Sequence, residues 1–131
     1  MITIDIKIPS HYPVNRESIK HGVEAILKQR TMENVEVSIL FVGDRQMKTL
    51  NTQYRKIEDT TDVLSFPQHD PSQPMHQFVT PPDKTIYLGD IIVSYPQAIK
   101  EAAQESVMVD DKILQLVLHG LDHLMGIHHP E

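Results

Sequence analysis

The chain is organised around its last stretch, HGLDHLMGIHH, which spans residues 119–129. His119 and His123 are four residues apart, so on a helix their imidazoles lie about 40° apart on one face and can share an ion. Gly126 can then end the helix in the left-handed conformation that glycine favours, and the chain can fold back to bring His129 to the same ion. Three neutral imidazoles leave one zinc position open, which is typical of a catalytic site.

The residues before this stretch predict the helix that carries it. Val109 and Asp110 lead into a segment that is apolar over most of its circumference, and such a helix is central and buried. On its projection the two histidines lie in a narrow polar sector beside Lys112, Gln115 and Asp122. The apolar residues of this segment are Ile113, Leu114, Leu116, Val117, Leu118, Leu121 and Leu124.

The earlier chain alternates between strand and helix patterns. Period-two alternation or short apolar runs predict strands over 1–8, 35–42, 59–67 and 87–94, the last with a bulge or close backbone approach at Gly89. Helical spacing predicts one helix capped by Asn15, a short helix capped by Asp44, and a third with Pro96 in its first turn. The proline-rich segment 68–84 predicts a long surface loop.

These elements predict an α+β fold with a small mixed β-sheet packed with helices. We expect a single domain over residues 1–131, with a metzincin-like, metal-bearing central helix near the C-terminus. The chain has no cysteine, which excludes disulfides, thiolate nucleophiles and cysteine-based zinc sites. No apolar run approaches the ~18 residues of a membrane span, so we expect a cytoplasmic protein without a membrane partner.

Charge is unevenly distributed along the chain. The net charge is −6, which argues against non-specific coating of nucleic acid. However, one short segment holds four cations and no acid, and this local basic patch could meet phosphate. A solvated helix face is the alternative explanation. The four cations are Arg45, Lys48, Arg55 and Lys56.

Counted from His119, histidines at positions 0, 4 and 10 with glycine at 7 have the spacing of the metzincin-type zinc proteases. Those proteases place a glutamate directly after the first histidine as general base. This chain has Gly120 there, and glycine can neither accept nor donate a proton. Peptide hydrolysis by that route therefore lacks its base.

Three further motifs accompany the histidines: Asn51-x-x-Tyr54-Arg55, the run TDVLSFP at 61–67, and the run LGDI at 88–91. In this order and near this spacing, they and the His-Gly-x-x-His-x-x-Gly-x-x-His pattern resemble the YbeY family of bacterial rRNA maturation endoribonucleases. The resemblance implies one zinc ion held by His119, His123 and His129, with Arg55 as a functional arginine near the metal. A guanidinium and zinc can both stabilise charge on phosphoryl oxygens.

The resemblance also implies the biological role. It points to a zinc-dependent endoribonuclease that acts on single-stranded rRNA or an rRNA precursor, in maturation of the 3′ end of 16S rRNA and in ribosome quality control. The implied partners are the small ribosomal subunit or a ribosomal protein. Two other functions stay open. One is a non-catalytic, metal-stabilised ribosome-assembly factor, and the other is a metal-dependent hydrolase of peptides or small molecules, which needs a carboxylate base near the metal.

Some residue roles also stay open. The family usually has aspartate before the third histidine, whereas this chain has His128, so the third ligand is His128 or His129, and spacing favours His129. Arg55 could instead form a structural ion pair with a nearby acid, Glu58, Asp59 or Asp62. Asp122 could orient a ligand or accept a proton, and the alternative is that it simply faces solvent. We expect Asp62, Ser65 and Asp90 to hold loops and ligands by hydrogen bonds.

Overall fold

A four-stranded mixed sheet runs through the part of the chain that the computed structural model describes, residues 1–30, 34–68 and 85–126. Its strands are β1 (Ile2–Lys7), β2 (Val35–Val42), β3 (Val63–Pro67) and β4 (Ile86–Ser94), in the spatial order β1-β2-β4-β3. β1 and β4 pair parallel to β2, whereas β3 pairs antiparallel to β4. The predicted α+β fold with a small mixed sheet is confirmed.

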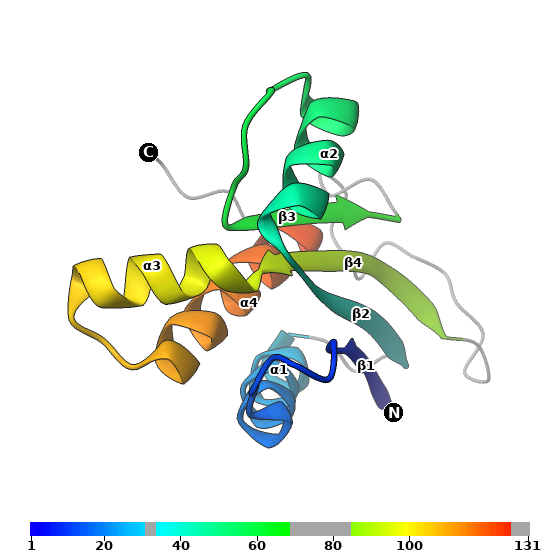
Figure 1. The fold of residues 1–131 in the computed structure, drawn as a ribbon. Coiled ribbons are helices and arrows are strands. Elements are labelled where there is room, and N and C mark those ends of the chain that lie inside the picture. Colours follow the sequence, from blue (N-terminus) through cyan, green and yellow to red (C-terminus); the bar gives the residue numbers. More distant parts are fainter. Residues whose placement is uncertain (31–33, 69–84, 127–131) are drawn as a thin grey trace.

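Helices cover both faces of this sheet (Figure 1). α1 (Arg16–Arg30) and α4 (Val109–Leu124) pack on one face and enclose the larger apolar core, while α3 (Tyr95–Glu105) packs beside α4. α2 (Asp44–Arg55) covers the other face over a smaller apolar cluster. Since α2 and α4 lie on opposite faces, their ends can meet only beyond the edge of the sheet, at β3. The smaller cluster contains Val42, Met47, Leu64 and Ile92.

Residues typical of helix starts predicted the beginnings of three helices, and two of these predictions are confirmed. Asn15 Oδ1 accepts the Ser18 N–H at 3.1 Å, which confirms the predicted cap of α1. Pro96 lies in the first turn of α3, as predicted. The predicted Asp44 cap is wrong: Gly43 is the N-cap of α2 and makes no side-chain cap bond. The Asp44 carboxylate instead accepts tertiary hydrogen bonds, from the Thr60, Ser94 and Gln97 side chains.

Two glycines confirm their predicted backbone roles. Gly89 has φ 139°, and the register between β2 and β4 shifts by one residue there, which is the predicted bulge. A Cβ at this position would collide with the Phe66 carbonyl oxygen of β3. Gly126 has φ 80° directly after the end of α4, so it stops the helix as predicted.

The predicted central helix is buried along most of its length. Its buried residues include Ile113, Val117, Leu121 and Leu124, but also Lys112, which is only 6% exposed. Over the described ranges, no helix is long and apolar enough to cross a membrane. Most of the predicted loop, residues 69–84, lies outside the described residues.

Candidate functional site

A pocket of about 450 Å³ lies where α2, β3 and α4 meet. Arg55, the last residue of α2, contributes to it from one side of the sheet edge, and His119, Gly120 and His123 contribute from α4. The segment that enters β3 supplies the rest of the wall. The pocket therefore joins two stretches of the chain, 55–65 and 119–123, that are at least 54 positions apart in sequence. The wall segment consists of Thr61, Asp62, Val63, Leu64 and Ser65.

The two histidines of the pocket occupy successive turns of α4, as the spacing predicts. Their ring centroids are 4.4 Å apart, with an interplanar angle of 59°. His119 is exposed and His123 is half-buried. Ser65 Oγ lies 3.5 Å from His123 Nδ1, so β3 can fix the orientation of that ring, which supports the predicted holding role of Ser65. Two adjacent imidazoles on one helix face suit two positions of a tetrahedral zinc ion.

The predicted third ligand cannot be placed, because His128 and His129 lie outside the described residues. Within residues 1–30, 34–68 and 85–126, no group of three histidine, cysteine, aspartate or glutamate side chains is arranged to hold a metal ion. His119 and His123 thus fit part of a zinc site, and the choice between His128 and His129 stays a prediction.

Arg55 lies in the same pocket as both histidines, although 64 and 68 residues separate them in sequence. It ends α2, where a cation interacts favourably with the helix dipole. Lys56 then takes a left-handed conformation with φ 61°, and Asn51 Nδ2 donates to the Asp59 carbonyl at 2.9 Å. These contacts fix the turn that leads from Arg55 to the pocket wall.

The alternative role of Arg55, a structural ion pair, is not supported. Among the described residues, its guanidinium forms no ion pair within 4.0 Å, and its side chain is exposed. A guanidinium held at a pocket without a protein carboxylate partner is placed to meet an anionic ligand.

Asp62 brings a carboxylate to the pocket wall. Its Oδ1 accepts the Val63 N–H at 2.7 Å and the Thr61 hydroxyl at 3.5 Å, so the predicted holding role of Asp62 is confirmed for its own loop. Asp90 does not line the pocket, and its carboxylate accepts a hydrogen bond from the Tyr87 hydroxyl. Asp122 does not line the pocket either.

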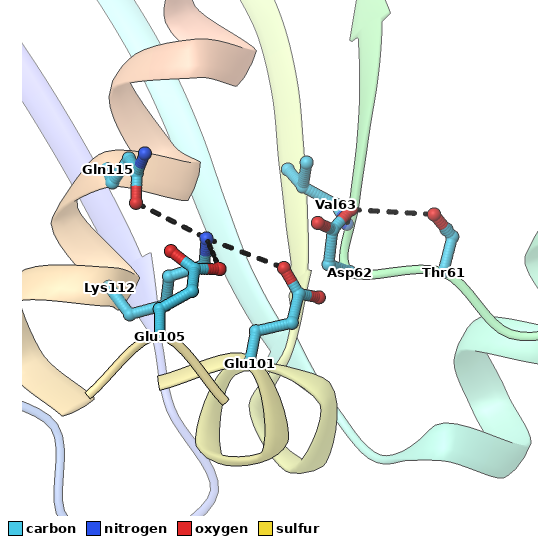
Figure 2. Close-up of polar contacts among 7 residues, drawn as sticks. All are labelled: Thr61, Asp62, Val63, Glu101, Glu105, Lys112 and Gln115. Carbon is cyan, nitrogen blue, oxygen red and sulfur yellow. Dashed lines mark hydrogen bonds and ion pairs between the residues drawn. The ribbon is translucent and has the colours of Figure 1, made fainter. Parts of the chain in front are cut away.

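Behind Asp62 lies a polar cluster that the sequence patterns did not predict (Figure 2). Lys112 of α4 is its centre, with Nζ 2.8 Å from Glu105 Oε2, 3.3 Å from Gln115 Oε1 and 3.5 Å from Glu101 Oε1. Burial lowers the pKa of Lys112, but the hydrogen bond and charge of Glu105, with those of Glu101, outweigh burial and raise it. The cluster thus keeps a charged ammonium inside the protein.

Glu101 connects this cluster to the pocket wall. Burial raises the pKa of Glu101, and the charge of Asp62 and a hydrogen bond with its carboxyl group raise it further, against the lowering effect of Lys112. The pKa of Glu101 is therefore raised above its ordinary value. The helical spacing predicted that Lys112 and Gln115 lie on the histidine side of α4. It did not predict that Glu101 and Glu105 of α3 lie next to Lys112.

The packing around Gly120 leaves no room for the glutamate that metzincin-type proteases carry at this position. It packs against β4, and a Cβ at position 120 would lie 2.8 Å from Ile91 Cγ2. Real Cβ contacts are longer than this, so even alanine would force α4 or Ile91 to move. A glutamate at this position could not be accommodated in the present packing.

The fold and the pocket define an α+β protein with a candidate catalytic site made of two histidines, an arginine and an aspartate at the edge of a mixed sheet. The chain belongs to the family described as Endoribonuclease YbeY, whose model matches residues 5–131. The resemblance predicted from the motifs is thereby confirmed.

Individual relatives agree with the family match. The chain is 36% identical over 135 residues to the Endoribonuclease YbeY of Dehalococcoides mccartyi, an alignment that covers 99% of this chain and 78% of the relative. It is also 36% identical over 130 residues to the Endoribonuclease YbeY of a Roseiflexus species, with 97% and 79% covered. A solution structure from Thermotoga maritima is similar in fold, with a TM-score of 0.63 and 26% identity, over 99% of this chain and 75% of that chain.

Proposed function

We propose that this protein is a zinc-dependent endoribonuclease that cleaves single-stranded rRNA precursors in the cytoplasm. The observation that carries the proposal is the convergence of Arg55, His119 and His123 on one pocket. The names of its relatives, Endoribonuclease YbeY, support the reaction class. Maturation of the 3′ end of 16S rRNA, ribosome quality control, and contact with the small ribosomal subunit or a ribosomal protein belong to the same proposal.

The described residues fit part of the implied metal site. His119 and His123 would hold the ion, with His129 as the predicted third ligand. A zinc ion bound there would supply positive charge that stabilises the negative charge developing on the phosphoryl oxygens. Ser65 Oγ lies 3.5 Å from His123 Nδ1, where it can orient that ring, and such supporting contacts sustain metal affinity.

Arg55 is the proposed phosphate clamp. Because its side chain forms no ion pair among the described residues, its five N–H donors are available to phosphoryl oxygens. Arg55 is the last residue of α2, and the left-handed turn at Lys56 follows it. These two features fix the backbone position from which the Arg55 side chain extends. Arg55 thus binds the scissile phosphate and stabilises the charge that grows on it.

The other cations of α2 extend this positive surface away from the pocket. Arg45, Lys48 and Lys56 are exposed. Arg45, Lys48 and Arg55 fall on one side of α2, since they occupy positions 0, 3 and 10 counted from Arg45, and Lys56 follows directly after the helix. None of the four forms an ion pair within residues 1–30, 34–68 and 85–126. We propose that they bind the phosphates that flank the cleaved bond.

The two other functions make different predictions. A non-catalytic assembly factor would need the metal for its fold and would cut no RNA. A hydrolase of peptides or small molecules needs a carboxylate near the metal, and Asp62 does line the pocket, so the structure does not exclude this function. The unpaired cations of α2 favour a polyanionic substrate over a peptide.

Cleavage of a labelled rRNA precursor fragment tests the proposal. The zinc-loaded protein is compared with Arg55→Ala and with Arg30→Ala, a matched control because Arg30 is also the exposed last residue of a helix, α1, outside the pocket. We expect Arg55→Ala to lose about 100-fold or more in rate, as when one donor to a transition-state oxyanion is removed. Arg30→Ala should cleave like the wild type, and all three proteins should melt at similar temperatures.

The outcomes separate the three functions. Wild-type cleavage of single-stranded but not duplex RNA supports the endonuclease. Absence of RNA cleavage, together with unfolding when zinc is chelated, supports the assembly factor. Cleavage of a peptide library without RNA cleavage supports the third function, and full activity in Arg55→Ala would remove the clamp from the mechanism.

A further inference from the structure

Tyr54 is an aromatic side chain that the fold leaves open to solvent. It is 58% exposed, whereas the other phenylalanines and tyrosines within residues 1–30, 34–68 and 85–126 are buried or half-buried. Aromatic rings carry a large apolar surface that folding normally removes from water. This ring stays at the surface on the last turn of α2, directly before Arg55, and is thus a candidate for contact with a ligand.

Its neighbours place Tyr54 at the margin of the pocket. Tyr54 does not line the pocket itself, but the next residue, Arg55, does. The Tyr54 ring packs against Phe66 of β3, with ring centroids 5.0 Å apart and an interplanar angle of 62°. Phe66 directly follows Ser65, another residue of the pocket wall. The ring therefore lies next to the pocket, on the face of β3 that α2 covers.

The contact with Phe66 supports the Tyr54 ring without covering it. Phe66 is half-buried and packs on the smaller apolar cluster under α2, as does Leu50, one turn before Tyr54. An edge-on pair occupies at most one face of an aromatic ring, and more than half of Tyr54 is open to solvent. Because the ring already has a packed neighbour, adding a second ring to it costs little conformational entropy.

The charges around the ring indicate which kind of ligand it meets. Arg55 and Lys56 directly follow Tyr54, and Arg45 and Lys48 lie earlier on α2. No acidic residue occurs in the sequence from 45 to 57. Unpaired nucleotides combine a flat base that stacks on aromatic side chains with a phosphate that binds cations. A ring among such cations therefore matches a nucleic-acid strand better than an apolar peptide.

We propose that Tyr54 stacks on an unpaired nucleobase of the RNA and so selects single strands over duplexes. Arg55 binds a phosphate beside that base, since the Cα atoms of adjacent residues are about 3.8 Å apart. A base inside a duplex is stacked on its neighbours and paired at its edge, so it has no free face for the ring. This inference rests on the proposed endoribonuclease function and adds a specificity-determining residue to it.

Binding of labelled single-stranded oligoadenylate to the zinc-loaded protein tests the inference, with fluorescence anisotropy read before any cleavage. Tyr54→Leu keeps an apolar side chain over Phe66 but removes the ring, and its affinity should fall about tenfold. Tyr54→Phe keeps the ring and should bind within about twofold of wild type, because stacking uses the ring face. Ile99→Ala is the control, since it removes exposed apolar surface from α3 outside the pocket.

Inorganic polyphosphate separates stacking from charge, because it carries phosphates but no bases. Tyr54→Leu should bind polyphosphate as tightly as the wild type does, whereas a variant that had merely displaced Arg55 would bind both ligands more weakly. All four proteins should melt at similar temperatures. A wild-type affinity of Tyr54→Leu for oligoadenylate, or an equal loss for oligoadenylate and polyphosphate, overturns the inference.

Cleavage of the rRNA precursor fragment connects the ring to specificity. The preference of the wild type for single-stranded over duplex RNA should shrink about tenfold in Tyr54→Leu. An undiminished preference overturns the inference while the proposed function stands. If the wild type cuts no RNA, the proposed function fails, and a tenfold loss of oligoadenylate affinity in Tyr54→Leu then supports stacking as a binding role alone.

Discussion

Gly120 of α4 lies directly against Ile91 of β4, so closely that a Cβ on the glycine would sit 2.8 Å from the isoleucine Cγ2. This contact holds the histidine-bearing helix against the sheet. Ile91 is fully buried and branched at Cβ, so its methyl group cannot easily move aside. The absence of a side chain at position 120 therefore allows α4 to pack closely against β4.

The first prediction concerns this contact. Gly120→Ala should lower the free energy of unfolding by about 1 kcal/mol, because overpacking costs about 1–3 kcal/mol and the gain in helix propensity offsets about 1 kcal/mol. Gly22→Ala in α1 is the matched control: its Cβ would meet Leu114 Cδ1, the end of a flexible side chain, at 2.7 Å. Urea unfolding should find Gly22→Ala neutral or stabilised; a Gly120→Ala protein as stable as this control would contradict the packing argument.

The second prediction concerns the pH dependence of stability. The folded-state pKa of Glu101 is raised above its ordinary value of 4.5 by burial and by Asp62. A carboxyl with a raised pKa contributes stability below that ordinary value and loses it as the pH rises through the folded-state pKa. The stability of the wild type relative to Glu101→Gln should therefore fall as the pH rises above 4.5. Urea titrations at several pH values measure this difference, and a difference that grows with pH would refute it.

The third prediction concerns metal binding. His119→Ala and His123→Ala should each reduce the zinc content from about one ion per chain towards none, because each removes one of the few ligands of a tetrahedral site. His21→Ala is the control, an exposed α1 histidine that lies 3.9 Å from Glu17. Elemental analysis of the purified proteins makes the measurement. His129→Ala should lose zinc and His128→Ala should keep it, and the reverse result would reassign the third ligand.

The fourth prediction concerns the cations of α2. The double variant Arg45→Gln and Lys48→Gln should bind single-stranded RNA more weakly, with a salt dependence reduced by about 0.7 logarithmic units per lost phosphate contact. Lys20→Gln with Arg30→Gln, on α1, removes the same charge from another helix. Fluorescence anisotropy over a series of salt concentrations gives both slopes. Equal slopes for the two double variants would show that α2 does not contact the phosphates.

Local patterns predicted most of the fold because the forces that they report act over a few residues. Asn15 bonds to a backbone N–H three residues on, and Gly126 needs a left-handed conformation that few other residues adopt. Asp44 shows the limit of this reasoning. Its side chain had the right type for a cap, but it is taken up by hydrogen bonds to Ser94 and Gln97, about 50 residues away.

The candidate site was predictable to a similar degree. His119 and His123 share a helix face by spacing alone, and the family resemblance pointed to Arg55. The Asp62 charge that raises the pKa of Glu101 comes from a segment 39 residues away, and nothing in the sequence pattern indicates this proximity. Lys112 was placed correctly on the histidine side of α4, but its burial depends on how α3 packs over it.

β3 gives the pocket an all-or-none character. Within the described ranges this strand is paired on one side only, to β4, and it leads directly from the wall segment that carries Asp62. Arg55 is joined to that segment by a short turn, whereas both histidines belong to another helix. If the pairing of β3 with β4 opened, Arg55 and Asp62 would both move away from His119 and His123. Local unfolding of this edge strand would therefore disassemble the whole site at once.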